Sequence, residues 1–391
     1  MERHRIRAYT SVQDTRTSQG RSASVVTKHL RAARAIFKWS ALGSLRGEIY
    51  RDGQTGVYVL QTEMGERMKI LVTGGLGLIG HNVVKRLQEQ GHTTSIIDNR
   101  TTYGMIPQAE LDYLMTERLK KIKLSPSHLY NRDICNKDSV DDIFEIEQPD
   151  VVIHMASFPR QKVVNADPAW GARVMMEGLI NVLEIAKKYH VKRVVYISSS
   201  MVYGDFENDV TEDAVCRPQG QYGIMKLAGE DLVKDYTRRG CFDHAIIRPS
   251  AVYGPLDVED RVVSKFMLTA MRGGVLRVNG ANETLDFTYV DDAADGIVAA
   301  ALVPAAANQT FNITKSHSVS LLQAAEMIVK IVDNGTIELR DKDADFPSRG
   351  ALNIDRARAV LGYDPKIDVA EGFDNYHAWF KSSLYWAPKT V

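Results

Sequence analysis

The segment Lys69-Ile-Leu-Val-Thr-Gly-Gly-Leu-Gly-Leu-Ile-Gly80 carries the strongest indication of the fold. Its first residues are mostly aliphatic and predict a buried strand, and Gly75–Gln90 predicts a turn followed by a helix. Glycines at positions 74, 77 and 80 let the backbone turn tightly, approach a ligand and pack the helix closely on the strand. The helix N-terminus adds free N–H groups and a positive dipole end, so this turn is suited to bind a phosphate group.

The chain beyond residue 68 alternates apolar, β-rich runs with amphipathic helical stretches. This alternation is typical of a parallel sheet covered by helices on both faces. We therefore predict an α/β fold in which residues 68–250 form a Rossmann-like doubly wound parallel sheet that carries this phosphate-binding turn. Residues 251–391 are predicted to be mainly a smaller, interleaved C-terminal substrate domain, with about 286–314 returning to the first domain. The later predicted strands and helices are Thr94–Ile97, Val151–His154, Leu179–Lys188, Arg193–Ile197, Tyr222–Arg238 and Ala245–Arg248.

The composition is that of an ordinary globular protein of 391 residues, 44% hydrophobic, with 49 basic and 49 acidic side chains. This balance of charge disfavours a nucleic-acid binder, which normally carries a basic surplus. No apolar run reaches the ~18–20 residues that span a bilayer, so no membrane partner is expected. Cys135, Cys216 and Cys241 share no metal-binding spacing, and we predict no metal site, no disulfide framework and a cytoplasmic location.

Residues 1–67 form a basic extension with twelve Lys or Arg and six Asp or Glu. Two interpretations of this extension stay open. Its Arg- and Ser-rich, acid-poor start is typical of an organelle-targeting peptide. Alternatively, it is a disordered tail or the product of a start codon assigned too far upstream, because Met64 and Met68 immediately precede the first predicted strand.

Asp98 follows the second predicted strand, eighteen residues after Gly80. A carboxylate at this place accepts hydrogen bonds from the ribose of an adenine dinucleotide, and its charge repels a 2′-phosphate. NAD is therefore the predicted cofactor, although Arg100 leaves NADP open as the alternative. The predicted contacts from this half of the site are Gly74, Gly77, Leu78, Ile79, Gly80, Asp98 and Asn99, with Asp133 and Ile134 beside the adenine.

A pattern suited to proton transfer lies further along the chain. Ser198-Ser-Ser-Met-Val-Tyr-Gly204 follows a buried strand, and Tyr222-Gly-Ile-Met-Lys226 follows it after about twenty residues. The i,i+4 spacing puts Tyr222 and Lys226 on one helix face. A nearby ammonium group favours the phenolate of a tyrosine, whose unperturbed pKa is about 10. We predict that Lys226 lowers the pKa of Tyr222, which takes a proton from a substrate hydroxyl that Ser199 orients.

At these residues the chain resembles the extended short-chain dehydrogenase/reductase family, specifically its NAD-dependent sugar-nucleotide epimerases and dehydratases. The resemblance runs from Met68 to about Phe373 and includes His154-Met-Ala-Ser157, Arg248-Pro-Ser-Ala-Val-Tyr-Gly-Pro255 and Asp286-Phe-Thr-Tyr-Val-Asp-Asp292. It implies a nucleotide-sugar substrate and a homodimer built through the helices near 173–189 and 221–239. The catalytic residues that it implies are Ser199, Tyr222 and Lys226, with NAD contacts from Tyr222, Lys226, Met155, Ala156 and Pro249.

The residues after Ser199 indicate which reaction the resemblance implies. Sugar-nucleotide 4,6-dehydratases typically have an Asp-Glu pair there, whereas this chain has Ser200 and Met201. Because methionine cannot transfer a proton, the chain looks more like UDP-hexose 4-epimerases, which oxidise the sugar transiently to a 4-keto intermediate and then reduce it again. The alternatives are an NAD-dependent dehydrogenase, ketoreductase or dehydratase on a sugar or other hydroxylated substrate, and a non-catalytic dinucleotide sensor.

Three positions depart from the family pattern. Met175 stands where an asparagine usually supports the proton relay, while Ala251 and Leu285 stand where Asn and Arg usually bind the diphosphate. Other arginines could replace these ligands, because a planar guanidinium suits two phosphate oxygens. The predicted substitutes are Arg277, Arg349 and Arg261, with Ser200, Arg160 and Lys162 as further predicted substrate contacts.

Overall fold

The structure, a computed structural model, describes residues 45–51, 58–64, 66–101, 104, 106–123, 125–158, 161–343, 346–383 and 385–386. Its contacts divide the chain into two units, residues 1–67 and 68–391. In the first unit, β1 (Leu45–Arg51) and β2 (Tyr58–Met64) pair as an antiparallel hairpin. The sequence pattern predicts no strand in this basic extension, so the hairpin is a feature that only the structure reveals.

Seven strands form the central sheet of the second unit: β3 (Lys69–Thr73), β4 (Thr93–Ile97), β5 (Leu129–Tyr130), β6 (Val151–His154), β7 (Arg193–Ile197), β8 (Asp243–Pro249) and β13 (Gln309–Ile313). Their order is β13-β8-β7-β6-β3-β4-β5, and every neighbouring pair is parallel. The order reverses at β3, because the chain runs outward to β4 and β5 and then crosses back to β6. Such a reversal opens a crevice beyond the carboxyl ends of the strands.

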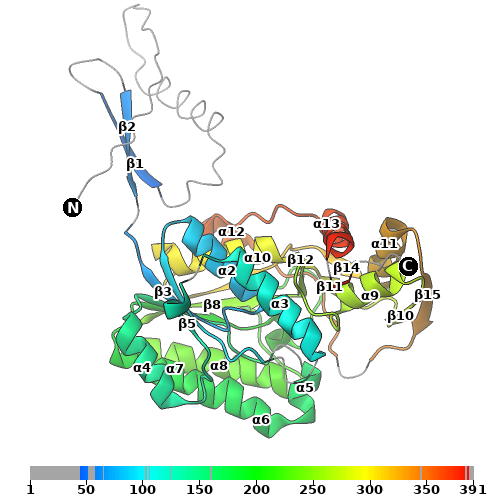
Figure 1. Ribbon diagram of the computed structural model, residues 1–391, viewed down its shortest axis with the longest axis horizontal. Helices are drawn as coiled ribbons and strands as arrows, with labels where there is room; N and C mark the ends of the chain where they lie inside the picture. The colour runs from blue at the N-terminus through cyan, green and yellow to red at the C-terminus, as the bar shows by residue number, and fades with distance from the viewer. Residues whose placement is uncertain are drawn as a thin grey trace, which may run out of the picture. The chain divides into compact units, whose positions relative to one another are not determined.

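Helices cover both faces of this sheet (Figure 1). One face packs against α2 (Leu78–Glu89), α10 (Val290–Leu302) and α12 (Asp355–Leu361). The other face packs against α4 (Lys137–Glu147), α7 (Gly178–Lys188) and α8 (Gly220–Arg238). The strands are largely apolar because they are buried on both faces. The connecting helices are α3 (Gln108–Lys121), α5 (Gln161–Ala166), α6 (Pro168–Ala172), the π-helical η3 (Arg173–Glu177), and the 3-10 helices η2 (Pro126–His128), η4 (Ser200–Tyr203) and η5 (Pro304–Ala306).

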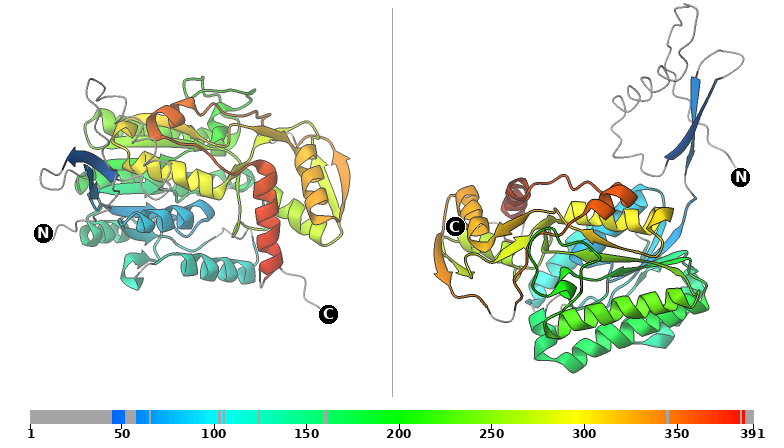
Figure 2. Two further views of the ribbon diagram at one scale, coloured as in Figure 1. Left: turned by 90° about the horizontal axis from the view of Figure 1, so that it is seen from above. Right: turned by 180° about the vertical axis from the view of Figure 1, so that it is seen from behind.

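The remaining elements form a smaller part with its own apolar core, grouped at one end of the second unit in Figure 2. Its helices are α9 (Val262–Met271), α11 (Leu321–Val332) and α13 (Val369–Ser382). Its short strands pair as β9 (Val252–Tyr253) with β12 (Thr288–Tyr289), β10 (Val275–Asn279) with β15 (Thr336–Arg340), and β11 (Thr284–Asp286) with β14 (Ser318–Ser320).

The chain passes between the larger and the smaller part more than once. After β12 it returns to the larger part, where α10 packs on one face of the sheet and β13 pairs with β8. It then leaves through β14 and α11, and α12 comes back to the same sheet face before α13. Within the described ranges, none of the helices combines the length and apolar character that crossing a bilayer would need.

Candidate active site

The glycine-rich turn between β3 and α2 is shaped by close backbone contacts. Gly74 has a φ of +70°, and its N–H donates to the Ile97 carbonyl oxygen at 2.8 Å. A Cβ at Gly74 would lie only 2.8 Å from the Ala156 backbone nitrogen, and one at Gly80 would collide with the Gly74 carbonyl oxygen. Helix α2 begins at Leu78 without a side-chain cap, so its first N–H groups are available to a bound phosphate.

Asp98 stands at the carboxyl end of β4, beside this turn. Its carboxylate accepts hydrogen bonds from the backbone N–H of Leu76 at 2.9 Å and of Arg100 at 2.7 Å. Burial raises the pKa of Asp98, and these two hydrogen bonds oppose the rise. Asn99 donates to Asp133 at 3.4 Å, which brings the predicted ribose and adenine contacts together.

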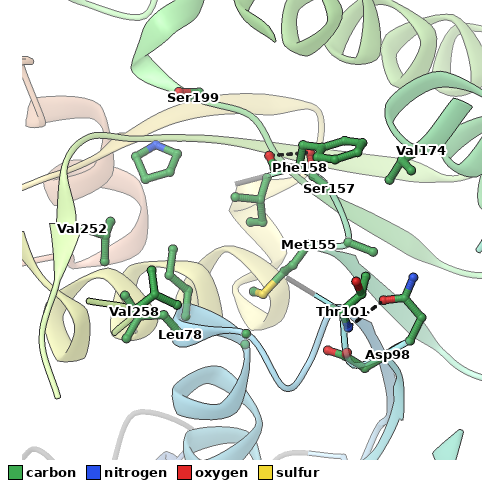
Figure 3. A pocket seen from close by; sticks show the side chains of 18 of the residues that line it. Leu78, Asp98, Thr101, Met155, Ser157, Phe158, Val174, Ser199, Val252 and Val258 are labelled. Carbon is green, nitrogen blue, oxygen red and sulfur yellow. Dashed lines mark hydrogen bonds between the residues drawn. The ribbon is translucent and has the colours of Figure 1, made fainter. Parts of the chain in front are cut away.

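These groups line one cavity of about 310 Å³ (Figure 3). Asp98 and Thr101 lie toward one end of the view and Ser199 toward the other, with Met155 between them. The residue types present suit a dinucleotide for two reasons. The turn has no room for a Cβ, so its backbone can approach the pyrophosphate, and the Asp98 carboxylate can accept hydrogen bonds from a ribose. Every NAD contact predicted from the sequence lines this cavity: Gly74, Gly77, Leu78, Ile79, Gly80, Asp98, Asn99, Asp133, Ile134, Met155, Ala156, Tyr222, Lys226 and Pro249.

Ser199, Tyr222 and Lys226 line the same cavity. Ser199 follows β7, whereas Tyr222 and Lys226 lie one turn apart on α8. The Lys226 Nζ donates to the Ile197 carbonyl oxygen at 2.8 Å and lies 5.9 Å from the centre of the Tyr222 ring. A hydrogen bond joins the Ser199 and Tyr222 side chains. The structure therefore brings the predicted hydroxyl groups and amine into one cluster that is able to hold and transfer a proton.

The charges in this cluster differ from the expectation based on the sequence. Burial lowers the pKa of Lys226 to about 7, so this lysine is only partly charged near neutral pH. Burial raises the pKa of Tyr222, and the positive charge of Arg261 and the hydrogen bond with Ser199 oppose that rise. The positive charge of Arg261 therefore acts on the Tyr222 phenol beside a Lys226 that is only partly charged.

A buried hydrogen-bond network lies beside the reactive cluster, and the sequence pattern does not predict it. Arg248 donates to the two carboxylate oxygens of Glu230 at 2.9 and 2.6 Å, and Ser198 donates to Glu230 at 2.6 Å. Glu230 is on α8 and Ser198 precedes Ser199, so the network ties the helix that carries Tyr222 to the end of β7. Arg248, directly after the apolar run of residues 245–247, is the signal that could have revealed it, because charged side chains are rarely buried without a partner.

His154 supports the glycine-rich turn from the end of β6. Its Nδ1 is 3.0 Å from the Thr73 hydroxyl, which also accepts a hydrogen bond from the Ala156 N–H at 3.2 Å. Burial lowers the pKa of His154 to about 3, so the imidazole is neutral near neutral pH. In the part of the chain that the structure describes, no three His, Cys, Asp or Glu side chains gather as a metal site.

The structure does not place Arg277, a predicted substrate contact, among the residues that line the cavity. Arg277 lies on β10, where alternate residues face outward, and its side chain is 62% exposed. Its Nε is 3.4 Å from the Glu338 carboxylate on the neighbouring strand β15. The structure therefore assigns Arg277 to a surface ion pair instead of the cavity lining.

The other predicted substrate contacts have different surroundings. Arg349 is not among the residues that line the cavity, and its Nη1 is 3.5 Å from the Met201 sulfur. Ser200 is buried and is also not among the lining residues. Lys162 forms an ion pair with Asp343 at 2.6 Å. Arg160 lies outside the described residues.

Met175 is buried in a small apolar cluster with Phe158, Val164 and Val174. It belongs to the π-helical η3, a local widening of the helix that is frequent at functional sites. Val174 from this turn lines the cavity. Met175 itself is not among the lining residues, so the side chain that this turn contributes to the cavity is the apolar Val174.

The fold and the site define a dinucleotide-binding α/β protein with a Ser-Tyr-Lys cluster at its cavity. The family model described as "NAD dependent epimerase/dehydratase family" matches residues 70–314. A putative UDP-glucose 4-epimerase of Methanocaldococcus jannaschii is 30% identical over 80% of this chain and 99% of its own length. An uncharacterized UDP-glucose epimerase of Bacillus subtilis is 29% identical over 81% of this chain and 99% of its own. The chain belongs to the NAD-dependent epimerase/dehydratase family.

Solved structures agree with this assignment. The UDP-glucuronic acid 4-epimerase of Bacillus cereus, in complex with UDP-glucuronic acid and NAD, is 27% identical with a TM-score of 0.74, and the match covers 81% of this chain and 99% of that one. The UDP-glucose 4-epimerase of Thermotoga maritima with UDP-glucose is 25% identical with a TM-score of 0.72, and the match covers 81% and 100%. The predicted family, fold class and NAD cofactor are confirmed.

Proposed function

We propose that this chain is an NAD-dependent epimerase that inverts C4 of the sugar in a nucleotide-diphosphate sugar. The observation that carries the proposal is the placement of Ser199, Tyr222 and Lys226 in the same cavity as the glycine-rich turn and Asp98. Relatives named as UDP-glucose and UDP-glucuronate 4-epimerases support it. Met201 supports epimerisation over dehydration, because a thioether cannot protonate a leaving hydroxyl group.

The side chains of the cavity account for the proton movements of such a reaction. The glycine-rich turn and Asp98 would hold NAD, which would supply an acceptor for the C4 hydride and return it to the opposite face of the 4-keto sugar. Tyr222 takes the proton of the C4 hydroxyl as the ketone forms and gives it back as the ketone is reduced. Ser199 hydrogen-bonds Tyr222 and orients the reacting oxygen. The buried Lys226 is held at the Ile197 carbonyl, which positions its amine next to the tyrosine ring.

A direct test is to incubate the purified full chain with a panel of UDP-sugars in deuterated water and to follow the products by NMR. We expect C4 epimers to interconvert without net NADH absorbance and without deuterium at the sugar carbons, because the same hydride leaves and returns. Stoichiometric NADH would favour the dehydrogenase alternative, and deuterium at C5 would favour a dehydratase. Absence of turnover with the whole panel would contradict the proposal and favour a sensor.

Asp98 is proposed to set the preference for NAD over NADP. Asp98→Asn keeps an oxygen that can accept from the Leu76 N–H and removes the charge that repels a 2′-phosphate. We expect the ratio of the NADP to the NAD dissociation constant to fall about tenfold, the equivalent of ~1.4 kcal/mol. Titrations that follow tryptophan fluorescence would measure both constants. An unchanged ratio would assign the discrimination to another residue.

We also propose a homodimer that forms through α6, α7 and α8. Trp170, Ile180 and Ile224 on these helices are 42%, 40% and 53% exposed, although they are large apolar side chains. Charged residues in a buried apolar patch oppose association, so Ile180→Asp with Ile224→Asp should weaken the dimer ~100-fold or more. Sedimentation velocity would measure this, with Val215→Asp, at a 73% exposed loop position, as the matched control. An unchanged dimer would place the interface elsewhere.

The organisation of the chain supports further assignments. We propose that residues 68–250 bind NAD, that residues 251–391 mainly bind the substrate, and that residues 1–67 are an extension outside the catalytic unit. The family match begins at residue 70, and the structural division falls between residues 67 and 68.

A cytoplasmic location is proposed because Cys135, Cys216 and Cys241 are free thiols, as expected in a reducing compartment.

A further inference from the structure

The guanidinium group of Arg261 is a cation that lines the active-site cavity without a protein partner in the described part of the chain. Its backbone is fixed at the start of α9, where its carbonyl oxygen accepts from the Lys265 N–H at 2.7 Å. Its Nε is buried and makes no hydrogen bond with the described residues, which also form no ion pair with its terminal nitrogens. Buried donors are nearly always satisfied, so this donor is available to an acceptor on a bound ligand.

The acidic residues next to Arg261 in the sequence do not neutralise it, because they face other cations. Glu259 is paired with Arg272 at 2.9 Å, and Asp260 is paired with Lys265 at 2.7 Å. The positive charge of Arg261 is therefore directed to the cavity, where it acts on Tyr222.

The segment just before β9 also contains an unsatisfied polar group at the cavity. The Ser250 hydroxyl is buried and has no hydrogen-bond partner among the described residues, although it belongs to the lining of the same cavity. Ala251 has a φ of +36°, a conformation that costs energy for a residue with a side chain. Two unsatisfied polar groups and a strained backbone at one cavity wall are typical of a ligand site.

We propose that Arg261 binds an anionic group of the substrate, through two oxygens of a phosphate or of a carboxylate. This inference rests on the proposed function, and it identifies the residue that replaces the apolar Ala251 and Leu285 as an anion ligand. A guanidinium group matches such oxygen pairs with two parallel N–H donors. Nucleotide sugars carry phosphate oxygens in the diphosphate, and hexuronates add a carboxylate on the sugar. Arg261 could therefore bind either of these two anionic groups.

The test is direct binding to the NAD-loaded full chain, measured by calorimetry with UDP, UDP-glucose and UDP-glucuronate. Arg261→Gln removes the charge, and Arg277→Gln is the matched control because Arg277 is exposed and paired with Glu338. We expect Arg261→Gln to weaken binding about 10- to 100-fold, as the loss of charge-assisted hydrogen bonds predicts, and Arg277→Gln to leave it unchanged.

A comparison of the three ligands distinguishes binding of the diphosphate from binding of the sugar carboxylate. Equal weakening for all three assigns Arg261 to the diphosphate, whereas weakening for UDP-glucuronate alone assigns it to the sugar carboxylate. Unchanged binding of all three, or no binding by the unsubstituted protein, would overturn the proposal. Turnover is measured separately, so a protein that binds UDP through Arg261 but converts no sugar would contradict the proposed epimerase and leave the anion site standing.

A second readout distinguishes binding from a purely structural role. Because the Arg261 charge opposes the rise in the Tyr222 pKa, its loss should move the rise of kcat/KM with pH to higher pH. Arg261→Lys retains the charge and should restore the position of this profile, although it binds with less directional hydrogen bonds. A profile that is the same in all three proteins would contradict the placement of Arg261 beside the reacting groups.

Discussion

Tyr222→Phe is expected to lower kcat by ~10²–10⁴-fold while leaving NAD binding unchanged. The substitution removes one phenolic oxygen and keeps the ring that lines the cavity. That oxygen is the proposed acceptor of the C4 hydroxyl proton, and it hydrogen-bonds Ser199. Product formation would be followed by NMR, and NAD affinity by fluorescence. In the unsubstituted protein, burial raises the pKa of Tyr222, so the oxidative half-reaction should accelerate with pH as the phenolate fraction grows.

Tyr196→Phe is the matched control for this substitution. The Tyr196 ring also lies near Lys226, with Nζ 5.3 Å from its centre, but it is buried in the sheet and lies outside the cavity lining. We expect turnover within a few-fold of the unsubstituted protein. Full activity in Tyr222→Phe would refute its role as the base. A large loss in Tyr196→Phe would instead indicate that a phenol near Lys226 is needed for structure.

Glu230→Gln is expected to lower the free energy of unfolding by about 3–5 kcal/mol. The substitution leaves the Arg248 guanidinium buried without a charged partner, in a pair whose side chains are 4% and 0% exposed. It also disturbs the hydrogen bond from Ser198 at the base of the reactive cluster. Urea unfolding, followed by circular dichroism and tryptophan fluorescence, would give the change in free energy.

Glu338→Gln provides the comparison for this stability effect. Glu338 pairs with Arg277 and Arg340, but its side chain is 45% exposed. Water and salt screen such a pair, so its loss should change the free energy of unfolding by less than about 1 kcal/mol. If the two substitutions cost the same, the buried network would not be the main support of the site.

The sequence predicts best those features that depend on residues close to one another in the chain. Gly74 and Gly80 have no space for a Cβ, and this requirement is encoded in their spacing after an apolar strand. Tyr222 and Lys226 are one helical turn apart, so their joint orientation followed from α-helix geometry alone. The parallel sheet followed from the alternation of strands and helices, whereas the β1–β2 hairpin was missed because the extension lacks a clear alternating pattern.

Substrate contacts were harder to predict, because a charged side chain does not reveal its partner. Arg277 and Arg261 are equal candidates by residue type, yet the first pairs with Glu338 on the surface and the second lines the cavity. The burial of Lys226 could not be derived from its spacing to Tyr222 either. Burial lowers its pKa to about 7, so the lysine is only partly charged near neutral pH, and the charge of Arg261 also acts on the tyrosine.

By itself, the amino-acid sequence determined the family and the doubly wound sheet, and it located the glycine-rich turn and the three side chains proposed to react, because these depend on short-range spacing. Only the tertiary structure decided which arginine faces the cavity, how Arg248 and Glu230 support Ser198, and how strongly Lys226 is charged. Those properties depend on burial and on residues that are distant in the chain, and electrostatic energies change several-fold between water and a protein interior.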